Sequence, residues 1–319
     1  MTLRLRIKVA VLCGLLTLAT VAPSAFPGAV TPGTFYVVGT GPAGPELATA
    51  RALEVIKGAD FILCDPTIEK YFQEQLKGKP IMADPWKGMF DYKGKPWQKL
   101  SDMNPEEKRA FQKERIKIRE DLVRQIKEKL AQGKTVALLD SGDPCLFGPS
   151  HWFIEGFAPQ QVEIIPGVGA FSAAMAALKK SSIPAYDTRF VMQTSPYFFQ
   201  GRNKQDQDVV KNLAKYPTTM VFYMGVKELN HLVPLLQKSH PGDLPAAVVY
   251  YAGYPDKEKV VKGTLDTILD QVAQEKEPWM GLIIVGRCLE GKPYRSRVEN
   301  LVGYQEKKPA KTGSQAPKP

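Results

Sequence analysis

The sequence is poor in several features that mark particular classes of protein. It has four cysteines and three histidines in 319 residues, and no His or Cys cluster has the spacing of a metal site. After residue 25, no apolar run approaches the roughly 18 residues of a membrane-spanning helix. We therefore expect no metal site and no stable membrane span. Only three cysteines follow residue 25, an odd number that cannot form a complete disulfide framework.

Clustered positive charge is also scarce in the middle of the chain. The formal net charge is +10, but part of it lies at the two ends, in Arg4, Arg6 and Lys8 and in the lysines of the last residues. A nucleic-acid-binding surface needs Lys and Arg gathered on one face. We therefore expect no nucleic-acid partner, whereas a ligand with several carboxylates remains compatible with the mildly basic middle.

The first 25 residues have the layout of a secretory signal. Three cations precede an apolar stretch over residues 9–22, and small residues follow up to Ala25. We expect cleavage near Ala25 and export, most simply to the periplasm. An uncleaved membrane anchor is the alternative, and the protein is cytoplasmic if the signal interpretation is wrong.

Residues 34–183 are predicted to form an N-terminal α/β lobe. Short β-branched and aromatic runs alternate with helical patterns, which is typical of a parallel sheet with helices on both faces. The predicted strands are residues 35–38, 61–64, 80–83, 135–139 and 162–165, and the predicted helices are residues 46–57, 106–132 and 172–180.

Residues 184–290 are predicted to form a C-terminal α/β lobe with a mixed sheet. The predicted strands are residues 190–193, 219–223, 246–251, 260–261 and 282–285, and the predicted helices are residues 209–215, 227–237 and 264–275. Residues 305–319 are rich in Lys, Pro, Gly, Ser and Gln, which predicts a disordered tail.

Residues 84–104 fit neither lobe, because Trp86, Phe90, Tyr92 and Trp97 alternate with lysines without apolar periodicity. A solvated loop with anchoring aromatic residues is the favoured interpretation. A lid over a large, aromatic and acidic ligand is the alternative.

The first strand ends in a glycine-rich turn with Gly39, Gly41 and Gly44. This spacing between a strand and a helix matches a dinucleotide-binding fingerprint, and Asp65 ends the next strand. Pro42 and Pro45 remove two amide donors from the turn, which weakens its use as a pyrophosphate cradle.

Two further turn-rich loops follow later strands. One contains Gly142, Asp143 and Pro144 and ends at Gly148, and the other contains Pro166, Gly167 and Gly169. Ligands bind at the carboxyl ends of the strands in parallel α/β sheets. Three such turns along one edge therefore predict a ligand site, although Asp143 alone is also compatible with a helix cap.

Six short motifs occur in a fixed order along the chain. They are Val38-Gly39-Thr40-Gly41-Pro42, Asp65 after the second strand, Gly142-Asp143-Pro144 with Gly148, Pro166-Gly167-Val168, Tyr223-Met224-Gly225, and Ala252-Gly253 followed by Gly263-Thr264-Leu265. In these motifs the sequence resembles the tetrapyrrole methyltransferases, which use S-adenosylmethionine to methylate uroporphyrinogen and cobalt-precorrins. The resemblance extends from about residue 34 to residue 289.

The resemblance implies the two-lobed fold of that family, with S-adenosylmethionine between the lobes, a tetrapyrrole substrate and often a homodimer. By motif position, the implied cofactor contacts are Pro42, Gly142, Asp143, Leu146, Gly169, Ala170, Met224 and Gly253. Met224 has an equal alternative as an ordinary core residue.

Asp65 matches a position at which some family members have a carboxylate proposed to accept a proton from the tetrapyrrole. A structural carboxylate at the end of a strand is the alternative. The sequence departs from the family where the first loop usually continues Gly-Pro-Gly-Asp, because here Ala43, Gly44, Pro45 and Glu46 follow Pro42. We therefore expect a methyltransferase that acts on a tetrapyrrole. The alternatives are an exported tetrapyrrole-binding protein without activity and, less favoured, a dinucleotide-dependent oxidoreductase.

Overall fold

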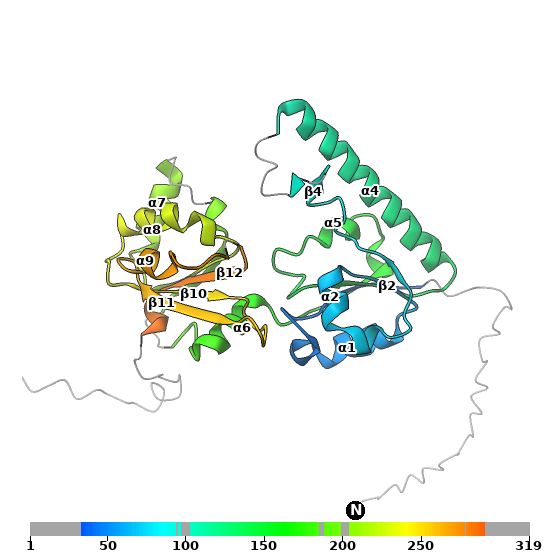
Figure 1. Ribbon diagram of the computed structural model, residues 1–319, viewed down its shortest axis with the longest axis horizontal. Helices are drawn as coiled ribbons and strands as arrows, with labels where there is room; N and C mark the ends of the chain where they lie inside the picture. The colour runs from blue at the N-terminus through cyan, green and yellow to red at the C-terminus, as the bar shows by residue number, and fades with distance from the viewer. Residues whose placement is uncertain are drawn as a thin grey trace, which may run out of the picture. The chain divides into compact units, whose positions relative to one another are not determined.

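The computed structural model describes residues 33–93, 95–96, 103–184, 188–198, 204–277 and 279–290 (Figure 1). These residues belong to one unit that begins at Pro32. The predicted signal in residues 1–25 and the predicted tail in residues 305–319 lie outside the described residues, as does part of the segment 84–104.

The first sheet has five strands, all parallel, in the order β3-β2-β6-β1-β7. Its strands are β1 (Phe35–Gly39), β2 (Phe61–Leu63), β3 (Ile81–Ala83), β6 (Val136–Asp140) and β7 (Val162–Ile165). The predicted parallel sheet is confirmed. Because all five strands are parallel, their carboxyl ends lie at one edge of the sheet.

Helices cover both faces of this sheet, because successive side chains of a strand point to opposite faces. Val38 and Leu139 pack with α1 (Ala50–Gly58), α2 (Pro66–Tyr71) and α3 (Gln73–Leu76). Their neighbours Val37 and Leu138 pack with α4 (Pro105–Ala131) and α5 (His151–Ile154).

The second sheet is mixed, with the order β11-β10-β12-β9-β8. Its strands are β8 (Phe190–Thr194), β9 (Thr218–Phe222), β10 (Pro245–Tyr250), β11 (Lys259–Thr264) and β12 (Gly281–Val285). Only β8 and β9 pair in parallel, and the other three pairs are antiparallel. The predicted mixed sheet is therefore also confirmed.

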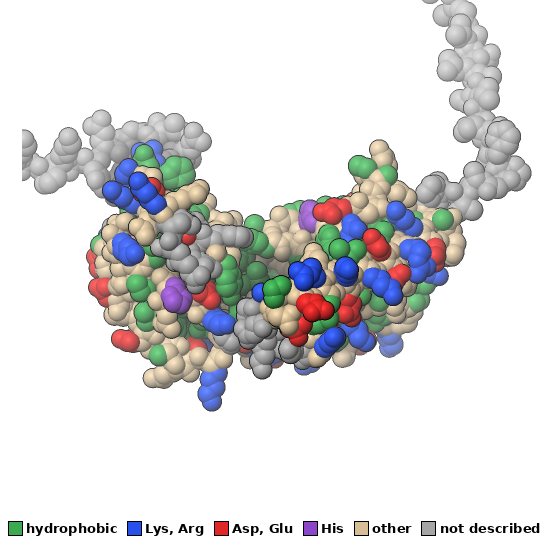
Figure 2. Space-filling model, turned by 90° about the horizontal axis from the view of Figure 1, so that it is seen from above, with side chains coloured by type: hydrophobic (Ala, Val, Ile, Leu, Met, Phe, Trp, Pro, Cys, Tyr) green, Lys and Arg blue, Asp and Glu red, His purple; other side chains and the backbone are tan. Residues whose placement is uncertain are grey.

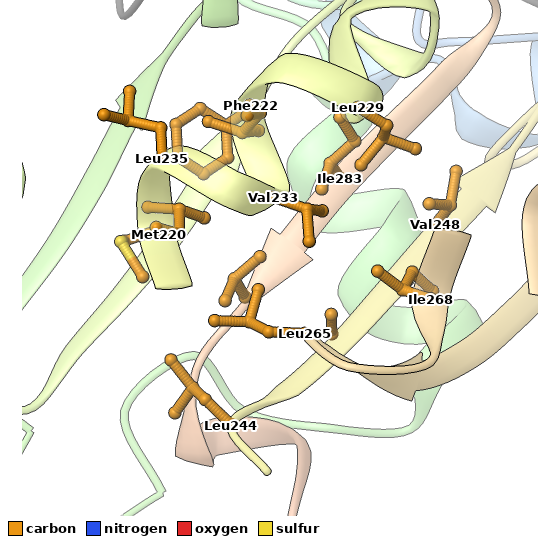
Figure 3. Close-up of a cluster of buried hydrophobic side chains, with 14 of the residues drawn as sticks. Met220, Phe222, Leu229, Val233, Leu235, Leu244, Val248, Leu265, Ile268 and Ile283 are labelled. Carbon is orange, nitrogen blue, oxygen red and sulfur yellow. The ribbon is translucent and has the colours of Figure 1, made fainter. Parts of the chain in front are cut away.

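One face of the second sheet holds a large apolar core (Figure 3). Side chains of α7 (Lys204–Leu213), α8 (Leu229–Gln237) and α9 (Ile268–Val272) meet those of the strands there. Met220, Phe222 and Ile283 are at most 1% exposed. The opposite face packs against α6 (Ala170–Leu178), whose Ala174 and Leu178 contact Val249 and Ile284 in one buried cluster. The proposed lobe boundary at residue 184 stays a prediction, and α6, which precedes it, packs on the second sheet.

Several predicted element boundaries were wrong for local reasons. The helix predicted from residue 46 begins at Ala50, because the Thr49 side chain accepts a hydrogen bond from the Ala52 N–H at 3.1 Å and caps it. Residues 45–47 form a separate 3-10 turn. The helix predicted over residues 264–275 is confined to α9, because β11 continues to Thr264.

The segment predicted as a loop contains a small hairpin of β4 (Asp91–Tyr92) and β5 (Lys95–Pro96). Two of its aromatic residues are anchored, since the Trp86 ring lies 5.8 Å from the ring of Phe153 and the Tyr92 ring lies 5.2 Å from that of Phe111. Phe90 remains 41% exposed. The interpretation as a lid stays a prediction.

Figure 2 shows basic and acidic side chains interspersed on the face that it presents, with no continuous basic patch. None of the helices in the described part of the chain has both the length and the apolar character of a membrane span.

Candidate functional site

Three turns meet at the carboxyl edge of the first sheet. Gly41, after β1, and Gly142, after β6, exchange two backbone hydrogen bonds of 3.3 and 2.8 Å. The Thr40 N–H and hydroxyl both donate to the Asp140 carbonyl, at 2.9 and 3.1 Å. The turns after β1 and β6 are therefore locked to each other.

Glycine is required in these turns by close backbone packing. A methyl group on Gly39 would lie 2.5 Å from the Gly167 nitrogen, and one on Gly167 would overlap the Gly142 carbonyl oxygen. Gly142 differs, because its φ of +78° needs glycine but the space above its Cα is open. Gly39 and Gly167 therefore build the edge, while Gly142 leaves room for a ligand.

This geometry weakens the dinucleotide alternative. A pyrophosphate cradle uses free backbone N–H groups of a turn, but the N–H groups of Gly41 and Gly142 already donate to each other's carbonyl oxygens. The described α1 helix also begins only at Ala50, with its N-terminus capped by Thr49. The glycine spacing of the first turn thus serves turn packing.

A pocket opens beside this edge, between the turns and the second sheet. Four of the predicted cofactor residues line it: Pro42, Gly142, Ala170 and Met224. The other described lining residues are Ser141, Tyr223, Val249, Tyr251, Ala252, Tyr254, Trp279, Met280, Gly281 and Leu282. The described lining is apolar and aromatic, and it contains no Lys or Arg.

The remaining predicted cofactor residues lie next to this lining. A methyl group on Gly253 would be 2.8 Å from Pro42 Cγ, and one on Gly169 would be 3.6 Å from Asp143 Cβ. Gly169 immediately precedes α6. Asp143 accepts a hydrogen bond from the Cys145 N–H at 3.0 Å, and the Leu146 N–H donates to the Asp143 carbonyl at 3.1 Å. Asp143 thus lies next to Gly169, the residue before α6. The role of these residues in cofactor binding stays a prediction.

Sequence reasoning named Tyr223 only as part of a motif and did not place the aromatic residues of the pocket in the site. Tyr223 precedes the recognised Met224, and Tyr251 and Tyr254 flank Ala252 and Gly253, so their positions beside the motifs were the available signal. Burial, with a smaller effect of Asp143, raises the pKa of Tyr223 to about 12. Burial also raises the pKa of Tyr254. These hydroxyls therefore stay protonated at neutral pH.

Two large side chains of the pocket have left-handed backbone. Met224 has φ of +53° and Tyr251 has φ of +48°, a region that residues with a Cβ rarely adopt. Met224 is also 47% exposed, so it is not an ordinary core residue. Because such strain concentrates at ligand sites, both residues support a functional role for the pocket.

The carboxylate of Glu277 holds one wall of the pocket in place. It accepts hydrogen bonds from the Tyr251 hydroxyl at 2.5 Å and from the N–H groups of Trp279 and Met280 at 2.8 and 3.0 Å. Burial acts to raise the pKa of Glu277, but the three hydrogen bonds outweigh it and lower this pKa. The hydrogen bond to Glu277, followed by burial, raises the pKa of Tyr251 to about 12.

Asp65, the predicted catalytic carboxylate, caps a helix. Its Oδ1 accepts hydrogen bonds from the N–H groups of Thr67 and Ile68 at 2.7 and 3.1 Å, at the start of α2. Its charge nevertheless reaches the pocket, because it contributes, after burial and Tyr71, to raising the pKa of Tyr254. Asp65 therefore has a structural role as the cap of α2, and its catalytic role stays a prediction.

Asp140, at the end of β6, is a second carboxylate at this edge. It is 5% exposed, and its Oδ2 has no hydrogen-bond partner among the described residues. Burial raises the pKa of Asp140, and Ser150 opposes this only in part. A buried carboxyl of this kind costs stability when it is charged.

We expect Asp140→Asn to stabilise the protein by about 1 kcal/mol at pH 8, because the amide has the same shape without the charge. The folded-state pKa lies above the unfolded value of about 3.8, so the wild type loses stability as pH rises through the folded-state pKa. Denaturant unfolding at pH 8 and pH 4 measures this, and the advantage of the variant shrinks at the lower pH. Equal stability of the two proteins at pH 8 would contradict it.

A larger cavity, of about 370 Å³, lies elsewhere, on the second sheet beside β9. Lys215, His240 and Arg287 line it, but none of the predicted site residues does. The turns, the strained residues and the motifs all favour the aromatic pocket as the site. No cluster of three or more His, Cys, Asp or Glu placed to hold a metal ion occurs in the described residues.

Comparison with known proteins identifies the family of the chain. The profile of a family described as Tetrapyrrole (Corrin/Porphyrin) Methylases matches residues 34–269. The cobalt-precorrin-4 C(11)-methyltransferase of Methanocaldococcus jannaschii is 30% identical over 264 residues, which are 81% of this chain and 89% of that protein. The uroporphyrinogen-III C-methyltransferase of Bacillus subtilis is also 30% identical over 264 residues, which are 81% and 91% of the two chains.

A solved structure shares the fold. It is uroporphyrin-III C-methyltransferase from Thermus thermophilus in complex with S-adenosylhomocysteine, with a TM-score of 0.55 and 21% identity. The similarity covers 81% of this chain and 99% of that one. With the family profile matching residues 34–269 and a 30% identical relative covering 81% of the chain, this protein belongs to the tetrapyrrole (corrin/porphyrin) methylase family.

Proposed function

We propose that the protein is a methyltransferase that moves a methyl group from S-adenosylmethionine to a carbon of a tetrapyrrole. Members of the family use this cofactor, and the two relatives compared with this chain are C-methyltransferases. The observation that carries the proposal is the aromatic pocket, because it gathers four of the predicted cofactor residues beside three interlocked turns.

The character of the pocket fits the cofactor better than it fits a dinucleotide. Its described lining has three tyrosines and one tryptophan without Lys or Arg. Aromatic faces attract cations, and a sulfonium is a cation. A pyrophosphate would instead need basic side chains or free amides. Tyr223, Tyr251 and Met224 would surround the nucleoside and thioether portions, and Asp143 would accept hydrogen bonds from polar groups.

S-adenosylmethionine supplies an activated methyl group, whose transfer forms a carbon–carbon bond and breaks a carbon–sulfur bond. The protein then has two tasks, to hold the acceptor carbon in line and to keep water out. The locked turns at Gly41 and Gly142 give the rigid edge for the first task. The apolar wall of Val249, Ala252 and Leu282 serves the second. The proton lost by the acceptor would go to a base, for which Asp65 is the candidate.

The acceptor is proposed as a reduced tetrapyrrole with several carboxylate side chains. The two relatives, equally similar to this chain, act on cobalt-precorrin-4 and on uroporphyrinogen-III, and both compounds belong to this chemical class. The choice between them is open to experiment.

Calorimetry with S-adenosylhomocysteine, followed by turnover assays with uroporphyrinogen-III and cobalt-precorrin-4, tests the proposed function. We expect binding and methyl transfer to at least one acceptor. No binding at millimolar ligand would refute the cofactor assignment. Binding that is unchanged in Asp143→Ala and Met224→Ala would refute the assigned site.

A tetrapyrrole-binding protein without activity is the second candidate. The observation in its favour is that the Asp65 carboxylate is engaged as a helix cap. Tight binding of a tetrapyrrole without S-adenosylhomocysteine binding or turnover would support it.

Export is proposed from the pattern of residues 1–25 alone. Fusion of residues 1–30 to a reporter that is active only outside the cytoplasm tests it, and a silent reporter would refute it.

A homodimer is also proposed, from the family resemblance. Sedimentation analysis tests it, and a monomer at micromolar concentration would be the contrary result.

A further inference from the structure

Arg115, on α4, is a cation held between two aromatic rings. Its guanidinium carbon lies 5.4 Å from the centre of the Phe111 ring and 5.1 Å from that of Trp152. Its Nε is buried, and no hydrogen-bond partner for it occurs among the described residues. The rings hold the guanidinium in a fixed place but cannot supply a hydrogen-bond acceptor on its edge.

Arg115 differs in its surroundings from the four described arginines that pair with carboxylates. Arg51, Arg124 and Arg287 each have a carboxylate partner that raises the pKa of the guanidinium. Arg119, one turn along α4, donates to the Trp152 carbonyl at 2.6 Å and pairs with Glu155 at 3.5 Å. Burial alone lowers the pKa of Arg115. Within the described residues, the positive charge of Arg115 therefore lacks a carboxylate partner.

The location connects Arg115 to the candidate site. Trp152 belongs to α5, which follows the loop that carries Gly142 and Asp143. Phe147 of the same loop is 45% exposed, and its ring lies 5.2 Å from that of Tyr223, which lines the pocket. The loop between β6 and α5 therefore connects the pocket to Trp152.

Further aromatic surface adjoins α5. Trp86, which follows β3, lies 5.8 Å from Phe153 and 6.0 Å from the exposed ring of Phe90. Arg115 contacts Trp152 of α5, and the next residue of α5, Phe153, joins this aromatic cluster, in which Phe90 is 41% exposed. Such surface suits the face of a large conjugated ring, and a guanidinium suits its carboxylates by two parallel hydrogen bonds.

We propose that Arg115 binds a carboxylate side chain of the tetrapyrrole acceptor, with Trp152 and Phe111 fixing the guanidinium for that contact. This inference rests on the proposed function and adds an acceptor subsite on α4. The segment from Trp86 to Phe90 lies against the same helix, because a methyl group on Gly88 would be 2.7 Å from Ile118 Cδ1 of α4.

Binding of uroporphyrin III, an octacarboxylate porphyrin, measured by quenching of tryptophan fluorescence, tests the proposal without turnover. We expect Arg115→Gln to raise the Kd about tenfold, since one charge-assisted contact is lost. The Kd of Arg115→Lys should lie between those of the wild type and Arg115→Gln, because lysine keeps the charge but not the geometry for two parallel hydrogen bonds. Arg124→Gln is the matched control on the same helix, and we expect wild-type affinity for it, because Arg124 pairs only with Asp121 and Glu128 among described residues.

Calorimetry with S-adenosylhomocysteine separates this inference from the proposed function. We expect the same Kd for this ligand in Arg115→Gln and the wild type. Equal porphyrin affinity in Arg115→Gln and Arg124→Gln, or no porphyrin binding by the wild type, would overturn the subsite. If Arg115→Gln weakens both ligands, Arg115 has a structural role and the subsite is refuted. Failure of the wild type to bind S-adenosylhomocysteine, with the porphyrin results as expected, would refute the proposed cofactor and leave the subsite standing.

Discussion

Gly167→Ala is expected to destabilise the protein by about 3 kcal/mol, the upper part of the range for overpacked sites. The added methyl group would overlap the carbonyl oxygen of Gly142 and lie 2.8 Å from the carbonyl carbon of Gly39. Both obstacles are backbone atoms of the other two turns, so no side chain can rotate to make room. The turns must separate, and the site they build is lost with them. Denaturant unfolding followed by circular dichroism measures the change.

Two other glycines serve as controls for that variant. A methyl group on Gly58, the last residue of α1, meets no atom within 4 Å, so Gly58→Ala should be neutral or stabilising by up to about 1 kcal/mol. Gly142→Ala also meets no atom, but its φ of +78° predicts a cost of about 1 kcal/mol from backbone strain alone. If Gly167→Ala is no less stable than Gly142→Ala, the close packing of the turns is not what requires glycine there.

Glu277→Ala is expected to weaken S-adenosylhomocysteine binding by about 10- to 100-fold, because hydrogen bonds to a charged group contribute about 1.5–3 kcal/mol each. Its carboxylate holds Tyr251, Trp279 and Met280, which are all part of the pocket lining. Removing it frees one wall, and the ligand must then order that wall on binding. Calorimetry measures the affinity, and the thermal midpoint should also fall, because the same hydrogen bonds stabilise the folded wall.

A series of variants separates the contributions to this wall. Tyr251→Phe removes only the hydroxyl and leaves the two backbone N–H groups bound to Glu277, so we expect a loss of less than about fivefold. Glu275→Gln is the control, because Glu275 pairs with Lys259 at 2.6 Å and lines no part of the pocket. Wild-type affinity in Glu277→Ala would show that this wall does not contact the ligand.

The comparison of α6 with its predicted helix shows where sequence reasoning reaches its limit. The helix predicted over residues 172–180 is confirmed as α6, which begins two residues earlier and ends at Leu178. Its partner was not predictable, because a helix that is apolar on most sides fits either sheet. The structure packs Ala174 and Leu178 against β10 and β12 of the second sheet. Residue Ala170 thereby reaches the pocket from the first lobe's last turn.

The aromatic wall shows the same limit for the site. Trp279 and Met280 have no periodicity or motif that marks them, and they acquire a role only because Glu277 turns the chain ahead of β12. The left-handed backbone of Met224 and Tyr251 is also invisible in the sequence, because neither is a residue type that favours it. Asp65, in contrast, was correctly placed at a strand end with a structural role as the alternative, but its capping of α2 was not foreseen.

The sequence by itself determined the two kinds of sheet, the three glycine-rich turns and the family, because strand periodicity, turn residues and motif order are all local properties. The tertiary structure alone decided how those turns meet. Gly39 and Gly167 serve to bring backbones together, whereas Gly142 keeps space open, and only contacts between separate turns of the chain distinguish these uses. The unpaired charge of Arg115 is likewise a tertiary property, since it depends on Trp152 packing over α4.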